Sequence, residues 1–270
     1  MDGNGPRKIL ITGGSSGIGA ALARAYAADG VTLYLGGRDL ERLEAVAADC
    51  RNRGAAVFVR CQDVTDRVGM ADWIAKAGAL DLVIANAGIS GGTGCITGGE
   101  DTVPGEDPAQ VRDIMAVNID GVVNTVFPAL DGMLDGAAPA SGVRGQIAIM
   151  SSLAGFRGLP GAPAYGASKA AVRSWGEGLR GLLAGQGVKV SVICPGFVES
   201  PMTAANPYHM PFLTASDRAA EIIKKGLARD RARIAFPWPL AALVWLLAAL
   251  PPSWLDPVVR RFPKKPAARR

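Results

Sequence analysis

Short apolar runs alternate with longer amphipathic segments along most of the chain, and this alternation is what most constrains its fold. Each run has the length of a buried strand, and each segment after it has the length of a helix. The expected strands are KILIT (8–12), TLYLG (32–36), AVFVR (56–60), LDLVIAN (80–86), QIAIMSS (146–152) and VKVSVICPG (188–196), with helices between them. Because strand–helix repetition builds parallel sheets, we predict an α/β fold: a doubly wound parallel sheet of six or seven strands with helices on both faces.

The length and composition favour a single large core. The chain has 270 residues, 49% of them hydrophobic and only 6% aromatic, which suits aliphatic side chains packed between helices and a sheet. We expect one domain over residues 1–235, followed by an apolar helical extension over 236–270 that ends in a basic tail. The polar, glycine-rich segment 90–107 is expected to be a loop over the carboxyl edge of the sheet, where ligands bind in open α/β folds.

The positive charge is concentrated at the end of the chain. The formal net charge is +5, whereas residues 260–270 alone carry six cations and no acid. Those cations are Arg260, Arg261, Lys264, Lys265, Arg269 and Arg270. The rest of the chain is nearly neutral, which argues against a nucleic-acid-binding face. Contact between the tail and an anionic surface and a simple solvated tail both remain open.

Cysteine and histidine usage argues against a metal cluster. The four cysteines stand singly without CxxC spacing, and His209 is the one histidine. The four are Cys50, Cys61, Cys95 and Cys194. The amino-terminal stretch lacks the long apolar run of a secretory signal, so we expect a reducing cytoplasm.

A glycine-rich turn, TGGSSGIG (12–19), joins the first expected strand to the first helix. Gly13 permits the tight turn, Gly17 allows the backbone to approach a pyrophosphate, and Gly19 allows the helix to pack on the strand. The unpaired N–H groups at the helix start then face the anion. A merely tight connection is the alternative. The other candidate cofactor-binding residues of this turn are Ser15, Ser16 and Ile18.

Together with CQDVTD (61–66), NAG (86–88) and the YxxxK motif described below, this TGxxxGxG spacing resembles the short-chain dehydrogenase/reductase family, in its short single-domain branch. The resemblance covers Lys8 to Glu199 and implies a Rossmann-like fold. It also implies that Asp63 binds the adenine amino group and that Asn86 supports the sheet beside the cofactor. Their neighbours Val64, Ala87 and Gly88 are further expected cofactor contacts, although turn or capping roles are the alternative for Asp63 and Asn86.

The choice of cofactor depends on LGGRD (35–39), at the end of the second strand. An acid there would bind the ribose hydroxyls of NAD, whereas a cation favours the 2′-phosphate of NADP. Gly37 occupies the position of that acid and Arg38 follows it, so we expect NADP(H) to be favoured over NAD(H). Two observations weigh against this: Ser16 stands where a second cation is common in NADP enzymes of the family, and Asp39 lies one residue further on.

Tyr165 and Lys169 are four residues apart on an expected helix and therefore project from one face. A free tyrosine has a pKa near 10, and an adjacent ammonium would stabilise its phenolate. Lowering the tyrosine pKa by about three units requires about 4 kcal/mol. The alternative is an exposed surface pair.

Ser152 ends a strand thirteen residues before Tyr165, where its hydroxyl can stabilise charge on a substrate oxygen. In the resembled family a serine, tyrosine and lysine at this spacing are catalytic. The family's fourth residue, which holds a water on the proton path to the lysine, matches Asn118. Ser151 is the neighbouring candidate for the serine role, one residue off the spacing.

PGFVES (195–200) follows the sixth strand. The resemblance implies that Pro195 and Gly196 turn under the nicotinamide, with Val198 and Ser200 meeting its carboxamide. It also implies a mobile lid at about 197–217, whose apolar residues suit a hydrophobic substrate or pack on the domain itself. His209 is expected on the lid surface.

The expected reaction is hydride exchange between NAD(P)(H) and a carbonyl carbon, with Tyr165 giving or taking the proton. We expect NADPH-dependent reduction of a lipid-like or steroid-like ketone. An NAD-dependent dehydrogenase of a small alcohol, and a non-catalytic dinucleotide-binding or membrane-tethered module, are the alternatives. A homo-oligomer, either a dimer or a tetramer, is expected.

FPWPLAALVWLLAALPPSW (236–254) has no charged residue. Its uninterrupted helix-forming part, residues 240–250, is about 16 Å long at 1.5 Å per residue, roughly half of a 30 Å hydrocarbon core, and prolines flank it. A membrane span is therefore disfavoured. Two interpretations remain open: a helix packed on the lid or on a partner subunit, and a helix lying in the inner surface of a membrane. Three tryptophans favour the second and the absence of a polar face favours the first.

Overall fold

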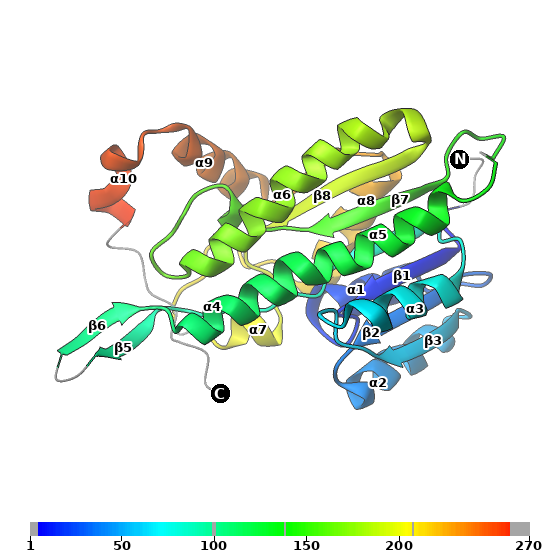
Figure 1. Cartoon of the computed structure of the whole chain (residues 1–270), viewed down its shortest axis with the longest axis horizontal. Coiled ribbons are helices and arrows are strands. Elements are labelled where there is room, and N and C mark those ends of the chain that lie inside the picture. Colours follow the sequence, from blue (N-terminus) through cyan, green and yellow to red (C-terminus); the bar gives the residue numbers. More distant parts are fainter. Residues whose placement is uncertain (1–4, 99–100, 138, 207, 260–270) are drawn as a thin grey trace.

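A seven-stranded, wholly parallel sheet forms the centre of the molecule (Figure 1). This computed structural model describes residues 5–98, 101–137, 139–206 and 208–259. The strand order is β3-β2-β1-β4-β7-β8-β9. The strands are β1 (Lys8–Thr12), β2 (Thr32–Gly37), β3 (Ala56–Cys61), β4 (Leu82–Ala85), β7 (Gly145–Met150), β8 (Val188–Pro195) and β9 (Arg233–Phe236). The predicted fold class is confirmed, with seven strands.

Helices cover both faces of the sheet. One face is covered by α1 (Gly17–Tyr26), α2 (Leu40–Arg51) and α8 (Ser216–Ala228), and the other by α3 (Arg67–Ala77), α5 (Gly121–Leu134) and α6 (Pro163–Leu183). Every residue of β4 and β7 is buried, since parallel strands between two helical layers meet no solvent. The chain order reverses between β1 and β4, which are neighbours in the sheet, and their carboxyl ends define the place where ligands bind in such folds.

The glycine-rich segment 90–107 differs from the expected loop. It contains an antiparallel hairpin of β5 (Gly94–Gly98) and β6 (Asp101–Gly105), which projects beyond α4 (Pro108–Met115) and away from the sheet (Figure 1). The sequence ITGGEDTV (96–103) has β-branched residues on both sides of a glycine pair, which is a hairpin pattern. Composition alone concealed it because the segment is also rich in glycine.

The carboxyl-terminal extension begins where the sheet ends. Strand β9 reaches Phe236, one residue beyond the expected domain boundary, and is followed by α9 (Trp238–Ala249) and α10 (Pro252–Val259). The expected apolar helix is therefore present. Within the described part of the chain, no helix combines the length and the apolar character needed to cross a bilayer. The basic tail, 260–270, lies outside the described residues.

Candidate active site

The turn between β1 and α1 has the geometry that its glycines predict. Gly13 and Gly17 have φ of 66° and 51°, in the left-handed region that favours glycine. A Cβ on Gly19 would lie 2.2 Å from the carbonyl oxygen of Gly13, so the helix could not pack this closely with any other residue. Ser16 is the N-cap of α1 but makes no side-chain capping bond. The first N–H groups of α1 are therefore available to an anion.

Asn86, directly after β4, holds this turn in place. Its Nδ2 donates to the carbonyl oxygens of Thr12 and Gly13, at 2.9 and 3.2 Å, and its backbone N–H donates to the Thr12 hydroxyl at 3.1 Å. Asn86 thus joins the ends of β1 and β4 at the reversal point of the sheet, the supporting position that we expected for it.

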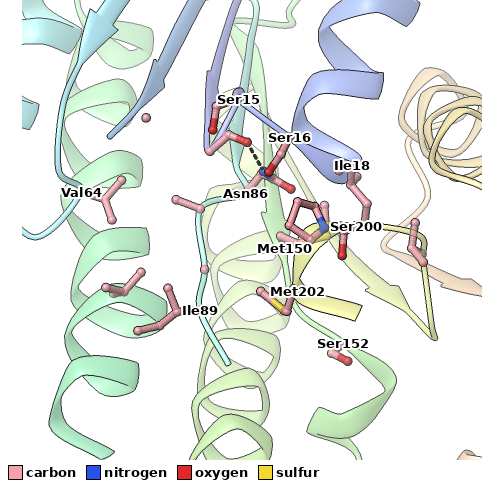
Figure 2. A pocket seen from close by; sticks show the side chains of 18 of the residues that line it. Ser15, Ser16, Ile18, Val64, Asn86, Ile89, Met150, Ser152, Ser200 and Met202 are labelled. Carbon is pink, nitrogen blue, oxygen red and sulfur yellow. Dashed lines mark hydrogen bonds between the residues drawn. The ribbon is translucent and has the colours of Figure 1, made fainter. Parts of the chain in front are cut away.

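A cleft of about 750 Å³ opens at this edge of the sheet. Figure 2 shows its lining, with Val64 and Ser200 on opposite sides. Of the predicted site residues, the cleft brings together Gly13, Ser15, Ser16, Gly17, Ile18, Arg38, Asp63, Val64, Asn86, Ala87, Gly88, Ser152, Tyr165, Lys169, Pro195, Gly196, Val198 and Ser200. Gly19 and Asn118 do not line it and act from behind its wall.

Ser152, Tyr165 and Lys169 meet at one end of the cleft. The Ser152 hydroxyl accepts from the Ala154 N–H at 3.1 Å and donates to the Pro195 carbonyl at 3.4 Å, and its interaction with the Tyr165 phenol lowers the pKa of that phenol. The Lys169 Nζ lies 5.8 Å from the centre of the tyrosine ring and donates to the Met150 carbonyl oxygen at 2.9 Å. The loop after β7 and the helix α6 therefore present a hydroxyl, a phenol and an amine to the same space.

Burial dominates the titration of this group. Desolvation raises the pKa of Tyr165 above its ordinary value, and the hydrogen bond with Ser152 lowers it by a smaller amount. Desolvation likewise lowers the pKa of Lys169 to about 8. The raised pKa of Tyr165 differs from the lowering that the sequence led us to expect, because residue spacing does not reveal that both groups are removed from water.

Ser151, the alternative to Ser152, is occupied elsewhere. Its hydroxyl is buried and donates to the Lys169 carbonyl oxygen at 2.8 Å, so it fastens the strand end to α6. The Ser152 hydroxyl instead faces the cleft. Both serines line the cleft, but the Ser151 hydroxyl is committed to the Lys169 carbonyl.

Asn118 lies in a π-helical turn, Ala116–Asp120, between α4 and α5. The buried Asn118 side chain accepts from the Ile89 backbone N–H at 2.8 Å and donates to the Ile89 carbonyl at 3.0 Å and to the Ser168 hydroxyl at 2.9 Å. A Cβ on Gly88 would lie 3.1 Å from Asn118 Oδ1 and 3.2 Å from Lys169 Nζ. Gly88 therefore preserves a narrow gap between the two polar groups.

At the other end of the cleft, Arg38 and Arg42 form a basic rim at the end of β2. Asp39, the acid that weighed against NADP, caps α2 by accepting the Arg42 N–H at 3.0 Å and pairs with the Arg42 guanidinium. These hydrogen bonds lower the pKa of its carboxyl. Ser16 supplies no second cation, whereas Arg42, in the first turn of α2, lines the cleft and was not considered from the sequence.

Asp63 ends a turn at the same end of the cleft. Its Oδ1 accepts from the Thr65 N–H at 2.9 Å and from the Thr65 hydroxyl at 2.8 Å. These contacts are those of a turn residue, and the side chain also lines the cleft. The turn role and the expected adenine contact are therefore compatible in this geometry.

The segment after β8 closes the cleft beneath Ser152. The Gly196 N–H donates to the Phe236 carbonyl at 2.8 Å, which ties the turn to β9. Ser200 caps the short helix α7 (Pro201–Ala204) in a reciprocal box with Thr203. Met202, on that helix, reaches into the cleft (Figure 2). Ser216 is the first residue of α8, and its hydroxyl donates to the Glu199 carbonyl.

Sequence reasoning missed several lining residues because they follow or precede the motifs. Met202 and Thr203 lie within the expected lid, 197–217, where Met202 was one of the apolar residues thought to suit a hydrophobic substrate; Met150 directly precedes the serine pair, so its position next to a motif was the available signal. The other lining residues that were not named as site residues are Gly37, Asp39, Arg42, Gln62, Ile89, Val117 and Pro201, and Ser151, the alternative to Ser152, lines the cleft as well. Among the described residues, no group of three or more histidine, cysteine or acidic side chains could hold a metal ion.

Known proteins share this sequence and architecture. The family profile described as short chain dehydrogenase matches residues 7–210. An uncharacterized oxidoreductase of Myxococcus xanthus is 40% identical over 95% of this chain and 97% of its own. A putative ketoacyl reductase of monensin polyketide synthesis from Streptomyces virginiae is 32% identical over 90% of both chains. A short-chain dehydrogenase from Sphingobium yanoikuyae, solved in complex with NADPH, superposes with a TM-score of 0.76 at 24% identity, over 97% of this chain and 98% of its own.

Proposed function

The chain belongs to the short-chain dehydrogenase/reductase family and is an NAD(P)-dependent oxidoreductase, and from this premise we propose that it interconverts a ketone and a secondary alcohol, with NADPH-dependent reduction of a hydrophobic carbonyl substrate as its main activity. The observation that carries the proposal is that Ser152, Tyr165 and Lys169 line one cleft of about 750 Å³, with the Lys169 Nζ 5.8 Å from the centre of the Tyr165 ring. A bound nicotinamide would supply the hydride.

We assign the proton chemistry to Tyr165. Its phenol would donate a proton to the substrate oxygen during reduction, while the Ser152 hydroxyl hydrogen-bonds the same oxygen and stabilises the charge that develops on it. With a pKa of about 8, Lys169 can pass a proton toward Tyr165 near neutral pH. Asn118 orients this end of the cleft through Ile89.

The residues of the cleft fit a dinucleotide. The N–H groups of the first α1 turn, beside Gly13 and Gly17, suit the pyrophosphate, and the gap that these glycines leave would be closed by a Cβ. Asp63 and Val64 would contact the adenine, and Pro195 and Val198 the nicotinamide; all four line the cleft.

We propose NADP(H) as the preferred cofactor. Arg38 and Arg42 offer two guanidinium groups to a 2′-phosphate, and Asp39 is engaged by Arg42 and so is less able to accept ribose hydroxyls. The S. yanoikuyae protein that shares the fold was solved with NADPH, which is in keeping with this choice. Measured dissociation constants for NADPH and NADH test it, and tighter binding of NADH would reverse the assignment.

The proposed substrate class rests on the apolar lining beside Ser152. Ile89, Met150 and Met202 face the cleft there, and each CH₂ group that a substrate buries against them contributes about 0.8 kcal/mol. The Streptomyces virginiae relative is described as a putative ketoacyl reductase, which is in keeping with a ketone on an apolar chain. NADPH oxidation should be followed with 3-ketoacyl thioesters of increasing chain length, a steroid ketone and acetone. kcat/KM should rise with apolar length; a preference for acetone, or activity only with NADH, would favour the small-alcohol alternative.

A further inference from the structure

Helices α9 and α10 carry an exposed apolar surface, which we call the apolar band. It consists of Trp238, Leu243, Trp245, Leu246 and Trp254, which are 78, 50, 62, 54 and 69% exposed. No residue of α9 is buried. Monomeric proteins rarely leave so many large apolar side chains together in water, and such patches mark binding surfaces. Figure 1 shows α9 and α10 at one corner of the molecule, beyond the carboxyl end of the sheet.

The opposite side of α9 is attached to the body of the protein. Leu240 and Ala241 pack against the cluster that contains Leu153. The Arg157 guanidinium donates to the Leu250 carbonyl at 3.0 Å, which fastens the end of α9 to the loop after Ser152. The absence of a polar face, which argued against a membrane surface helix, is thereby explained: the protein, not water, covers the side of α9 that an isolated interfacial helix would leave polar.

Charge indicates what the band contacts. Residues 236–259 contain one charged residue, Asp256, whereas the eleven residues that follow contain six cations and no acid. Indole rings favour the headgroup zone of a bilayer, and cations next to it are attracted by anionic lipids. A second copy of the chain would carry the same positive charge in residues 260–270, so charge complementarity favours an anionic lipid surface over self-association.

We propose that the apolar band docks on the surface of an anionic lipid bilayer, with α9 lying in the interfacial plane and the basic tail contacting lipid headgroups. The docking does not depend on the catalytic proposal. Docking would nevertheless affect the proposed reaction. Gly196 lines the cleft, and a Cβ on it would lie 2.9 Å from Leu240, so α9 borders the substrate end of the cleft. Docking would hold the mouth of the cleft beside the source of an apolar substrate.

Vesicle flotation of the full-length protein tests the proposal. We would use vesicles of phosphatidylcholine alone and vesicles with about one third phosphatidylglycerol, at low and at high salt. We expect binding to the anionic vesicles, little binding to the neutral ones, and weaker binding at high salt because charge attraction is screened.

Two variants separate the band from the tail. The triple variant Trp245→Ser, Leu246→Ser, Trp254→Ser should bind anionic vesicles at least about tenfold more weakly than the wild type. The double variant Arg260→Ser, Arg261→Ser should lose roughly fivefold in vesicle affinity for each cation removed. The matched control is Phe58→Ser with Val68→Ser, which removes exposed apolar groups from β3 and α3 and should leave binding unchanged. Circular dichroism melting and NADPH affinity, unchanged in all variants, would show that each one folds.

Three results would overturn the proposal. The first is no binding to anionic vesicles, and the second is equal binding by the triple variant and the control. The third is that the wild type is a dimer in light scattering and does not bind vesicles, whereas the triple variant is a monomer. That result would mean that the band contacts a second copy of the chain. A failure of ketone reduction with intact vesicle binding would affect only the proposed function.

Discussion

Glu106 Oε2 accepts a hydrogen bond from the Ala164 N–H at 2.9 Å, although the two residues are 58 positions apart. Ala164 lies in the first turn of α6, the helix that carries Tyr165 and Lys169, and the N-cap residue of this helix, Ala162, has no side chain that could cap it. Glu106, at the base of the projecting hairpin, therefore caps α6 from a distant segment. The start of α6, and hence the phenol, is positioned by this contact.

Replacing Glu106 tests that role. Glu106→Ala should destabilise the fold by about 1 kcal/mol, as for other lost caps, and lower kcat while the dissociation constant of NADPH changes little. Glu106→Gln keeps an acceptor for the Ala164 N–H and should restore most of kcat. Thermal unfolding and steady-state kinetics measure both effects, and equal kcat in the two variants would remove the positioning role.

Tyr165→Phe should abolish measurable turnover, because the proton donor is lost and general acid catalysis contributes about 10² to 10⁴ in rate. NADPH affinity should stay within about twofold, since the ring still fills the wall of the cleft. Ligand fluorescence titration and NADPH oxidation measure the two quantities. Retained turnover would exclude Tyr165 as the proton donor.

The basic rim should control cofactor choice. Arg38→Ala combined with Arg42→Ala should weaken NADPH by at least about tenfold, because charge-assisted hydrogen bonds to the 2′-phosphate are lost, while NADH affinity holds or improves as Asp39 is released. Arg24→Ala, which removes a surface pair with Asp49, is the control. The dissociation constants of NADPH and NADH, measured for each variant, test this prediction. An equal loss of affinity for both cofactors would contradict the role of the rim in cofactor choice.

The buried Lys169 should make the free energy of unfolding depend on pH in the alkaline range. Its pKa is about 8 in the folded protein, against 10.5 for an ordinary lysine. Between these values the unfolded chain binds more protons, so stability rises with pH through this window, and below pH 8 the penalty for burying the charge is present in full. The penalty is on the order of 3 kcal/mol. Denaturant unfolding of Lys169→Met, compared with wild type at pH 7 and above 10, should show that the variant's advantage shrinks as pH rises.

Filling the gap at Gly88 tests whether the spacing between the Asn118 and Lys169 side chains matters for turnover. Gly88→Ala would place a methyl group 3.1 Å from Asn118 Oδ1 and 3.2 Å from Lys169 Nζ, and should lower kcat with little change in NADPH affinity. The matched control is Gly178→Ala on α6, where nothing lies within 4 Å of the added Cβ and stability should hold or rise. Similar kcat in the two variants would show that the gap has no role in turnover.

Local sequence patterns were sufficient to predict those features that depend only on residues close together in the chain. The left-handed Gly13 and Gly17, and the four-residue spacing of Tyr165 and Lys169 on one helix face, were predictable because one turn or one helix determines them. Apolar periodicity likewise predicted the sheet, since a strand buried on both faces has to be apolar throughout.

Contacts between distant segments were not predictable from those patterns. The cap of Glu106 on α6 and the π turn that directs Asn118 to Ile89 depend on how separate elements pack. The pairing of Asp39 with Arg42 could have been predicted from the sequence more easily, because the two residues are three positions apart at the start of α2.

The sequence by itself determined the fold class, the glycine turn and which residue types could perform hydride chemistry, because periodicity and spacing encode them locally. Only the tertiary structure decided that the Ser151 hydroxyl bonds to the Lys169 carbonyl and that Arg42 lines the cleft together with Arg38. It also decided which side of α9 is exposed. These outcomes depend on burial and on partners far away in the chain, and burial exists only after the helices and the sheet have packed together.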